Sequence, residues 1–163
     1  MAFTDKKLDR RSFLKVSALA GGGMMLSFSW LAGCKPKPED VLTMPDEWFE
    51  LNSYIKIGDN GVVTLFNPNP EFGSNVKTSL PMLLAEELDV DWEMVTVEQA
   101  DFYPERFDRQ FTGGSQGIRQ GWKPLRTAGA TARKLIVQAA SQSWNVPEDE
   151  ITTNHGTVEH KTS

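Results

Sequence analysis

The sequence has very little cysteine and histidine. Cys34 is the single cysteine among 163 residues, and there are only two histidines. A disulfide within the chain is therefore excluded, and so is a metal cluster held by several cysteines. A buried free thiol is the usual state of a lone cysteine, but the place of Cys34, directly after Leu31-Ala32-Gly33, indicates another role.

Basic residues are scarce beyond the N-terminal region. Residues 1–33 contain 5 of the 17 basic residues and 2 of the 22 acidic ones, so the remainder has a formal charge of −8. Because binding to a phosphate backbone needs a basic surface, we expect no nucleic acid as a partner. The remainder is long enough to bury one core, and it contains no internal repeat.

Charge is absent altogether from residues 16–32, which follow a basic segment containing Arg10 and Arg11. This order is typical of a signal peptide. The two arginines followed by Ser-Phe-Leu-Lys indicate the twin-arginine export route, which carries folded proteins. An uncleaved N-terminal anchor is the alternative, but three consecutive glycines, 21–23, interrupt the short apolar run and favour a cleaved signal.

The Leu-Ala-Gly-Cys sequence that ends at Cys34 is typical of a lipoprotein cleavage site. We therefore expect residues 1–33 to be a twin-arginine lipoprotein signal peptide and Cys34 to carry the lipid. Such a lipid anchors a protein to a membrane, which predicts a periplasmic, membrane-anchored lipoprotein. Residues 34–50, with prolines and lysines at their start, are expected to form the tether, and residues 51–163 the domain.

The rest of the chain predicts an α+β fold. Two β-rich runs, 54–57 and 62–66, flank a Gly-Asp-Asn-Gly turn and indicate a β-hairpin. The expected order is this hairpin, a helix, a strand, a long helix and a closing hairpin. The predicted segments after the first hairpin are the helix 78–88, the strand 95–98, a helix from about 118 to 144, and strands 151–153 and 157–159.

Particular residues have expected places in these elements. Thr78 or Ser79 can cap the first helix, with Pro81 in its first turn. Small residues at 128–132 of the long helix are expected to allow close packing against the sheet. Its apolar positions at alternating spacings of four and three are expected to form a seam: Ile118, Trp122, Leu125, Ala132, Ile136 and Ala139. Three tryptophans are expected in the core: Trp92, Trp122 and Trp144.

The sequence contains no nucleophile triad, zinc site, phosphate-binding Walker loop or dinucleotide fingerprint. Two glycine-containing loops, 67–75 and 113–117, each precede a predicted helix. Free backbone amides and the helix dipole make such helix starts suitable for anions. Ordinary turns are the alternative interpretation of both loops.

Basic residues follow the second loop, and a histidine lies in the closing hairpin. Arg119, Lys123 and Arg126 add positive charge near residues 113–117, although a solvated face with pairs to glutamate is the commoner arrangement. His155, between Asn154 and Gly156, is expected in a turn and not in catalysis.

From residue 54 to about 160 the chain resembles the start of the molybdopterin-binding large subunit of molybdenum hydroxylases. The closest type is the isoquinoline 1-oxidoreductase beta-subunit group of the xanthine dehydrogenase family. The resemblance rests on collinear stretches at residues 79–92, 95–100, 113–115, 122–130 and 144–147. It implies a bound molybdopterin cytosine dinucleotide. It also implies oxidation of an aldehyde or an N-heterocycle, with electrons passed to a [2Fe–2S] small subunit and onward to a cytochrome.

Two motifs carry over residue by residue. The Glu-Met-Gly-Gln-Gly loop of the family corresponds to residues 71–75, which implies cofactor contacts for Glu71, Gly73 and Ser74. Here Ser74 and Asn75 replace a glutamine and a glycine, which weakens the implied contact. The Gly-Gly-Ser loop corresponds to Gly113, Gly114 and Ser115, which are implied to bind the same cofactor.

The family's large subunit is several times longer, and its catalytic glutamate lies near the far C-terminus. We therefore expect an exported N-terminal segment of such a large subunit that is inactive alone, with no catalytic residue of its own. The alternative is a membrane-tethered periplasmic interaction module without cofactor.

Overall fold

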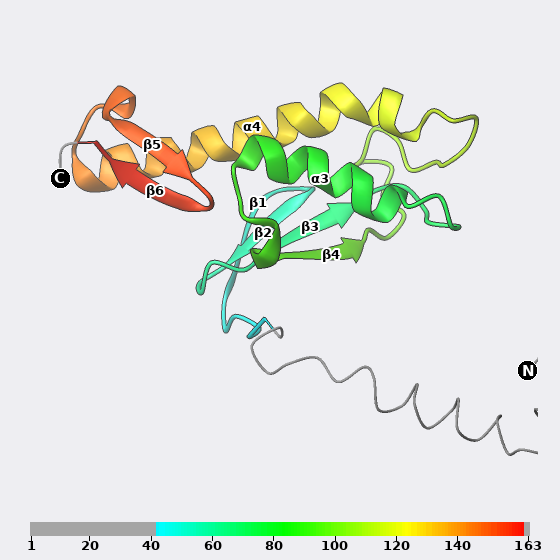
Figure 1. The fold of residues 1–163 in the computed structure, drawn as a ribbon, viewed down its shortest axis with the longest axis horizontal. Coiled ribbons are helices and arrows are strands. Elements are labelled where there is room, and N and C mark those ends of the chain that lie inside the picture. The colour runs from blue at the N-terminus through cyan, green and yellow to red at the C-terminus, as the bar shows by residue number, and fades with distance from the viewer. Residues whose placement is uncertain (1–41, 162–163) are drawn as a thin grey trace, which may run out of the picture. The chain divides into compact units, whose positions relative to one another are not determined.

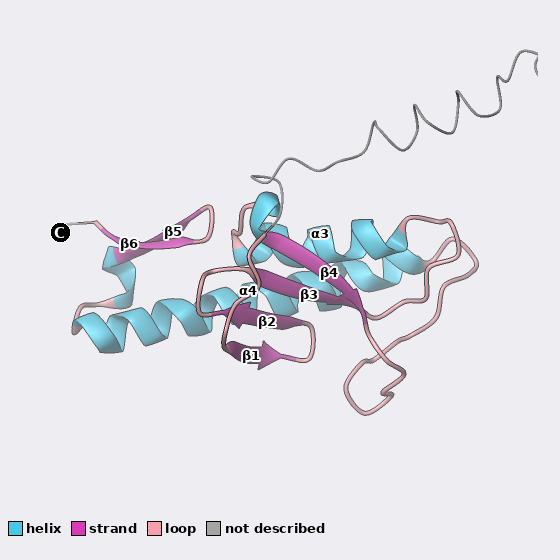
Figure 2. Ribbon diagram, turned by 90° about the horizontal axis from the view of Figure 1, so that it is seen from below, coloured by secondary structure: helices cyan, strands magenta, loops and turns pink. Residues whose placement is uncertain are grey.

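The computed structural model describes residues 42–161, and this part of the chain has the predicted α+β architecture. A four-stranded sheet carries both long helices on one face, and a separate two-stranded hairpin lies beside the far end of the longer helix (Figures 1 and 2). The elements are β1 (Trp48–Asn52), β2 (Ile55–Gly58), β3 (Val63–Asn67), α3 (Val76–Leu88), η2 (Trp92–Met94), β4 (Val95–Gln99), α4 (Gly117–Trp144), η3 (Glu148–Glu150), β5 (Ile151–Asn154) and β6 (Thr157–His160).

The predicted first hairpin is β2–β3, and its register pairs Ile55 with Leu65. Gly61 adopts φ +84° in the turn, where glycine meets no steric penalty. An additional strand, β1, pairs with β2 at the edge of the sheet. The sequence-based order omits β1, and residues 48–50 of this strand lie within the range assigned to the tether. Its side chains are partly exposed, so the strand has no strong apolar pattern.

Strands β3 and β4 are parallel neighbours, with Val63 opposite Val95 and Asn67 opposite Gln99. Parallel strands need a crossover connection, and α3 provides it. Both strands therefore end at the same edge of the sheet. The loops that leave them, 68–75 and 100–116, begin side by side.

Helix α3 begins two residues earlier than predicted, at Val76. The residue before it, Asn75, has the left-handed φ of 59° and offers no side-chain cap. Thr78 and Ser79 are therefore not the cap, and the Ser79 hydroxyl donates to the Asn75 carbonyl at 3.0 Å. Pro81 lies beyond the first turn, inside the helix. The prediction failed because the acceptor for the free amides comes from Glu71, outside the helix.

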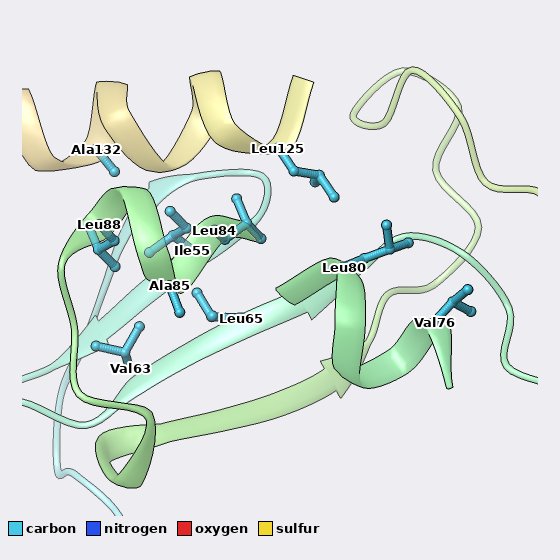
Figure 3. Packing of buried hydrophobic residues seen from close by; sticks show 10 residues of the cluster. All are labelled: Ile55, Val63, Leu65, Val76, Leu80, Leu84, Ala85, Leu88, Leu125 and Ala132. Carbon is cyan, nitrogen blue, oxygen red and sulfur yellow. The ribbon is translucent and has the colours of Figure 1, made fainter. Parts of the chain in front are cut away.

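The core lies between the sheet and the two helices (Figure 3). Gly129 of α4 allows the helices to approach closely, because any larger residue there would place its Cβ 2.6 Å from the Leu84 carbonyl oxygen. The small residues of α4 thus allow packing against α3, whereas the sequence had predicted packing against the sheet. The buried cluster comprises Ile55, Val63, Leu65, Val76, Leu80, Leu84, Ala85, Leu88, Leu125 and Ala132.

The tryptophans are not core residues, contrary to prediction. Trp92, Trp122 and Trp144 are 38%, 49% and 46% exposed. After Gly117, the buried residues of α4 start at Leu125, because the first two turns extend past the end of the sheet (Figure 1). These turns contact α3 at Gly117 and Gly121, beside Val76 and Leu80. Ile118 is consequently 39% exposed. Spacing predicts which residues share a helix face, but it does not predict how far the opposing layer reaches.

The hairpin β5–β6 is attached through Asp89, the residue that ends α3 with φ 60°. The Asp89 carbonyl accepts from the Gly156 amide at 2.6 Å, and its carboxylate accepts from Thr153 at 2.5 Å. Arg133 of α4 pairs with the same carboxylate at 3.3 Å. His155 lies in the hairpin turn, as predicted.

Candidate functional site at the carboxyl edge of the parallel strands

Two amide side chains close the carboxyl ends of β3 and β4. Asn67 is fully buried, and its Nδ2 donates to Gln99 Oε1 at 2.9 Å. Gln99 Nε2 returns a bond to the Asn67 carbonyl at 2.9 Å. Open α/β sheets bind ligands at this edge, because the loops and helix starts meet there. A ligand site is therefore expected among loops 68–75 and 100–116.

These two loops are bonded to each other. Buried Asn69 donates to the Phe111 carbonyl at 2.8 Å, and the Thr112 hydroxyl donates to the Pro70 carbonyl at 2.7 Å. The bonds lie next to the two predicted motifs, which begin at Glu71 and Gly113. The structure thus brings together two motifs that are about forty positions apart in the sequence.

The starts of α3 and α4 also converge at this edge. A Cβ on Gly117, the first residue of α4, would lie 3.3 Å from Val76, the first residue of α3. The two helices begin at the same end of the molecule and run side by side (Figure 1). Their positive dipole ends therefore point into one region, which favours a negative group there.

At α3 that negative group is already present. The Glu71 carboxylate accepts four backbone N–H bonds: Oε1 from Gly73 (2.5 Å), Ser74 (2.6 Å) and Asn75 (3.1 Å), and Oε2 from Lys77 (3.0 Å). These bonds, the one from Lys77 foremost, lower the pKa of Glu71 from 4.5 to about 2. Glu71 is therefore ionised at neutral pH.

At α4 the start of the helix has no such partner. Gln116 precedes the helix, and its side chain makes no capping bond within the described part of the chain. Gly114 and Ser115 both have left-handed backbones, with φ of 60° and 55°. This conformation turns the loop so that the chain can enter the helix. Within residues 42–161, no side chain accepts from the first amides of α4.

An arginine that the sequence patterns do not reveal lies beside this helix start. Arg109 lines a small cavity of about 30 Å³ together with Gly117, Gln120 and Pro124. Its Nη1 is buried and has no hydrogen-bond partner among the described residues. The guanidinium lies 5.1 Å from the centre of the Phe111 ring. A lone arginine in a loop carries no sequence signal; only the fold places it beside the helix start.

A wider groove of about 530 Å³ also borders the first loop, and its volume is in the range of ligand sites. Its charged lining residues are Glu71 and Lys77. Pro68, Pro70, Gln99, Ala100, Phe102 and Gln110 complete the lining. Phe102 is 76% exposed and forms part of the wall.

The basic residues of α4 are only partly available for a ligand. Arg126 pairs with Glu87 of α3 and lies 5.1 Å from the Trp122 ring centre, so the expected pairing with glutamate is confirmed for this residue. Arg119 and Lys123 are exposed. The described residues contain no group of three or more histidine, cysteine or acidic side chains suited to a metal ion.

The class of domain that this fold and edge belong to is given by the comparison with known families. Residues 20–163 match the molybdopterin cofactor-binding domain, and the chain belongs to this family. The predicted resemblance to the molybdopterin-binding subunits of the xanthine dehydrogenase family is thereby confirmed.

Three curated proteins are similar to this chain in sequence. The beta subunit of isoquinoline 1-oxidoreductase from Brevundimonas diminuta is 37% identical over 118 residues, 69% of this chain and 15% of the relative. A nicotinate dehydrogenase subunit from Pseudomonas putida is 34% identical over 67% of this chain and 9% of the relative. The membrane-bound aldehyde dehydrogenase [pyrroloquinoline-quinone] of Gluconacetobacter polyoxogenes is 29% identical over 89% of this chain and 18% of the relative. The chain thus spans less than a fifth of each relative.

Three predicted residues, Arg10, Arg11 and Cys34, lie outside the described residues. Within residues 42–161, no helix has the length and apolar character needed to cross a membrane.

Proposed function

We propose that this chain forms part of the cofactor cradle of a molybdenum hydroxylase that oxidises an aldehyde or an N-heterocycle. Membership of the molybdopterin cofactor-binding family over residues 20–163 carries the proposal. The names of two relatives, the isoquinoline 1-oxidoreductase and nicotinate dehydrogenase subunits, support a heterocyclic substrate class. When bound, the molybdenum cofactor supplies the oxygen-transfer and two-electron chemistry.

The second loop suits the phosphate groups of molybdopterin cytosine dinucleotide. The uncapped first turn of α4 offers backbone donors, and the unpartnered Nη1 of Arg109 lies beside it. Gly113, Gly114 and Ser115 would hold the cofactor through their backbone, since two of these residues already have the left-handed conformation. The role of this chain is to bind and orient the cofactor.

The assembly around the cofactor is part of the proposal. The relatives named as subunits support an enzyme of several chains, in which a [2Fe–2S] small subunit takes the electrons and passes them to a cytochrome. We propose export by the twin-arginine route through Arg10 and Arg11, and membrane attachment in the periplasm through lipid on Cys34. The described residues by themselves should not turn over substrate.

A chimera tests cofactor binding directly. Residues 54–160 of this chain would replace the homologous stretch of the Brevundimonas isoquinoline 1-oxidoreductase chain, produced with its partner. Molybdenum would be measured by mass spectrometry and pterin by the fluorescence of its oxidised form. We expect the chimera to retain both at the parent's stoichiometry. A folded chimera without pterin would reject the proposal.

A cofactor-free, membrane-tethered interaction module is the second candidate. One observation favours it: the amides of the first loop are already bonded to Glu71. Under this hypothesis the chimera folds and assembles, yet it contains neither molybdenum nor pterin. The full chain by itself is a further check, because stoichiometric molybdenum together with dye-linked aldehyde oxidation would refute the expectation of inactivity.

A further inference from the structure

We propose that Glu71 itself occupies the anion site at the start of α3 and keeps the first loop closed to the cofactor's phosphate groups. Glu71 would then be a positioning residue for the loop and not a cofactor ligand. This inference takes the identity of the excluded ligand from the proposed function. The geometry of the loop carries it.

The carboxylate uses both of its oxygens. Oε1 lies within 2.5–3.1 Å of three consecutive amides, those of Gly73, Ser74 and Asn75, and Oε2 lies 3.0 Å from the Lys77 amide. Consecutive amides that converge on one point form a nest, a common binding site for phosphate oxygens. The nest is therefore present, and a side chain of the same loop fills it.

The backbone of the loop fits this arrangement. Gly73 has φ +98° and Asn75 has φ 59°, and these left-handed residues flank Ser74 and turn the amides toward the carboxylate. A Cβ on Gly73 would meet no atom within 4 Å, so the glycine is required for its backbone angle and not for space. The backbone of the loop is thus arranged to bind the Glu71 carboxylate.

A second anion at this place would face the Glu71 charge. The groove beside the loop is lined by a single basic residue, Lys77, so the local charge is already balanced by one carboxylate. The lowered pKa of Glu71 agrees with this arrangement, since the amides favour the ionised form. At the start of α4, in contrast, no carboxylate of the described residues accepts from the backbone amides.

Inorganic pyrophosphate and amide resonances of the 15N-labelled full chain can test the proposal. In the unsubstituted protein, pyrophosphate should leave the resonances of Gly73, Ser74 and Lys77 unmoved. In Glu71→Ala, pyrophosphate should shift the same resonances. The affinity of this variant for pyrophosphate should be at least about tenfold higher than that of the unsubstituted chain. Glu105→Ala, which removes another exposed loop glutamate, should behave like the unsubstituted chain.

Saturable shifts of these amides in the unsubstituted protein would overturn the proposal, as would their absence in a folded Glu71→Ala variant. If that variant does not fold, hydrogen exchange in the unsubstituted chain decides: slow exchange of the four amides supports the bonds to Glu71, and exchange at the unprotected rate overturns them. The molybdenum content of the chimera is measured separately. A chimera without cofactor therefore rejects the proposed function and leaves this result standing.

Discussion

The starts of α3 and α4 differ in a way that their sequences do not suggest. Both follow a glycine-containing loop, both begin at the same edge of the sheet, and they lie beside each other at Val76 and Gly117. At α3, four amides are bonded to Glu71. Within the described part of the chain, α4 has no side-chain cap, and the nearby Nη1 of Arg109 has no hydrogen-bond partner. Two helix starts with similar backbone dipoles thus differ in whether a carboxylate already accepts from their amides.

The difference teaches that a helix start indicates an anion site only after its nearby acceptors have been examined. A glutamate five positions before a helix start can fill the site, as Glu71 does before Val76. The loop sequence alone gives equal weight to both sites. Three changes should break or sharpen the comparison.

The largest effect is expected from Gly129→Val, which separates the helices whose starts are compared. The valine Cβ would lie 2.6 Å from the Leu84 carbonyl oxygen, and the backbone there has no room to yield. We expect a loss of about 3 kcal/mol of stability, measured by denaturant unfolding. Ala130→Val, at an exposed position of the same helix, should cost less than about 1 kcal/mol. Equal losses in the two variants would contradict the close helix contact.

A smaller effect should follow from titrating or removing the Glu71 carboxylate. Its pKa is about 2 in the folded protein and ordinarily 4.5, so the ionised form stabilises the fold. This contribution is complete above about pH 4.5 and is lost as the pH falls toward 2.

Thermal unfolding across that pH range measures the contribution. Glu71→Gln should have a lower Tm than the unsubstituted protein at pH 7, and the difference should shrink as the pH falls toward 2. Glu105→Gln is the matched control and should show little difference at pH 7. A difference between Glu71→Gln and the unsubstituted protein that stays constant with pH would show that the charge of Glu71 does not hold the loop.

The smallest effect on stability, but a direct effect on the site at the start of α4, is expected from Arg109→Ala. Among residues 42–161 its Nη1 has no hydrogen-bond partner to lose, only the contact with the Phe111 ring, so the Tm should change little. In the chimera described above, molybdenum and pterin contents should fall several-fold, because a charge-assisted donor is removed. Lys134→Ala, on the exposed face of α4, should leave both contents unchanged. Unchanged contents in Arg109→Ala would remove this residue from the cradle.

Local patterns predicted most of the fold. The Gly-Asp-Asn-Gly turn predicted β2–β3, and the helical spacings predicted α3 and α4 to within two residues at their ends. Strand β1 was missed because a half-exposed edge strand has no strong apolar alternation. The core positions of the tryptophans were wrong because burial depends on where the opposing layer ends.

The site was less predictable than the fold, because it too depends on tertiary structure. The two loops could be predicted from their glycines. Their proximity in space depends on the parallel pairing of β3 with β4 and on the buried side chains of Asn67 and Asn69. Arg109 has no sequence pattern of its own, and its place beside Gly117 follows only from tertiary packing. The predicted cofactor contacts of Glu71, Gly73, Ser74, Gly113, Gly114 and Ser115 stay predictions.

The parallel pairing of β3 and β4 also has a consequence for the order of folding. The β2–β3 hairpin and helix α3 form from neighbouring residues, whereas Thr64 and Thr96 pair across a separation of 32 positions. Loop closure makes such distant contacts slow, so β4 should join the sheet after the hairpin and α3 have formed. Until then the outer edge of β3 is an unpaired strand that can associate with another chain. Newly made protein is thus most vulnerable to aggregation in the interval between the synthesis of β3 and the docking of β4.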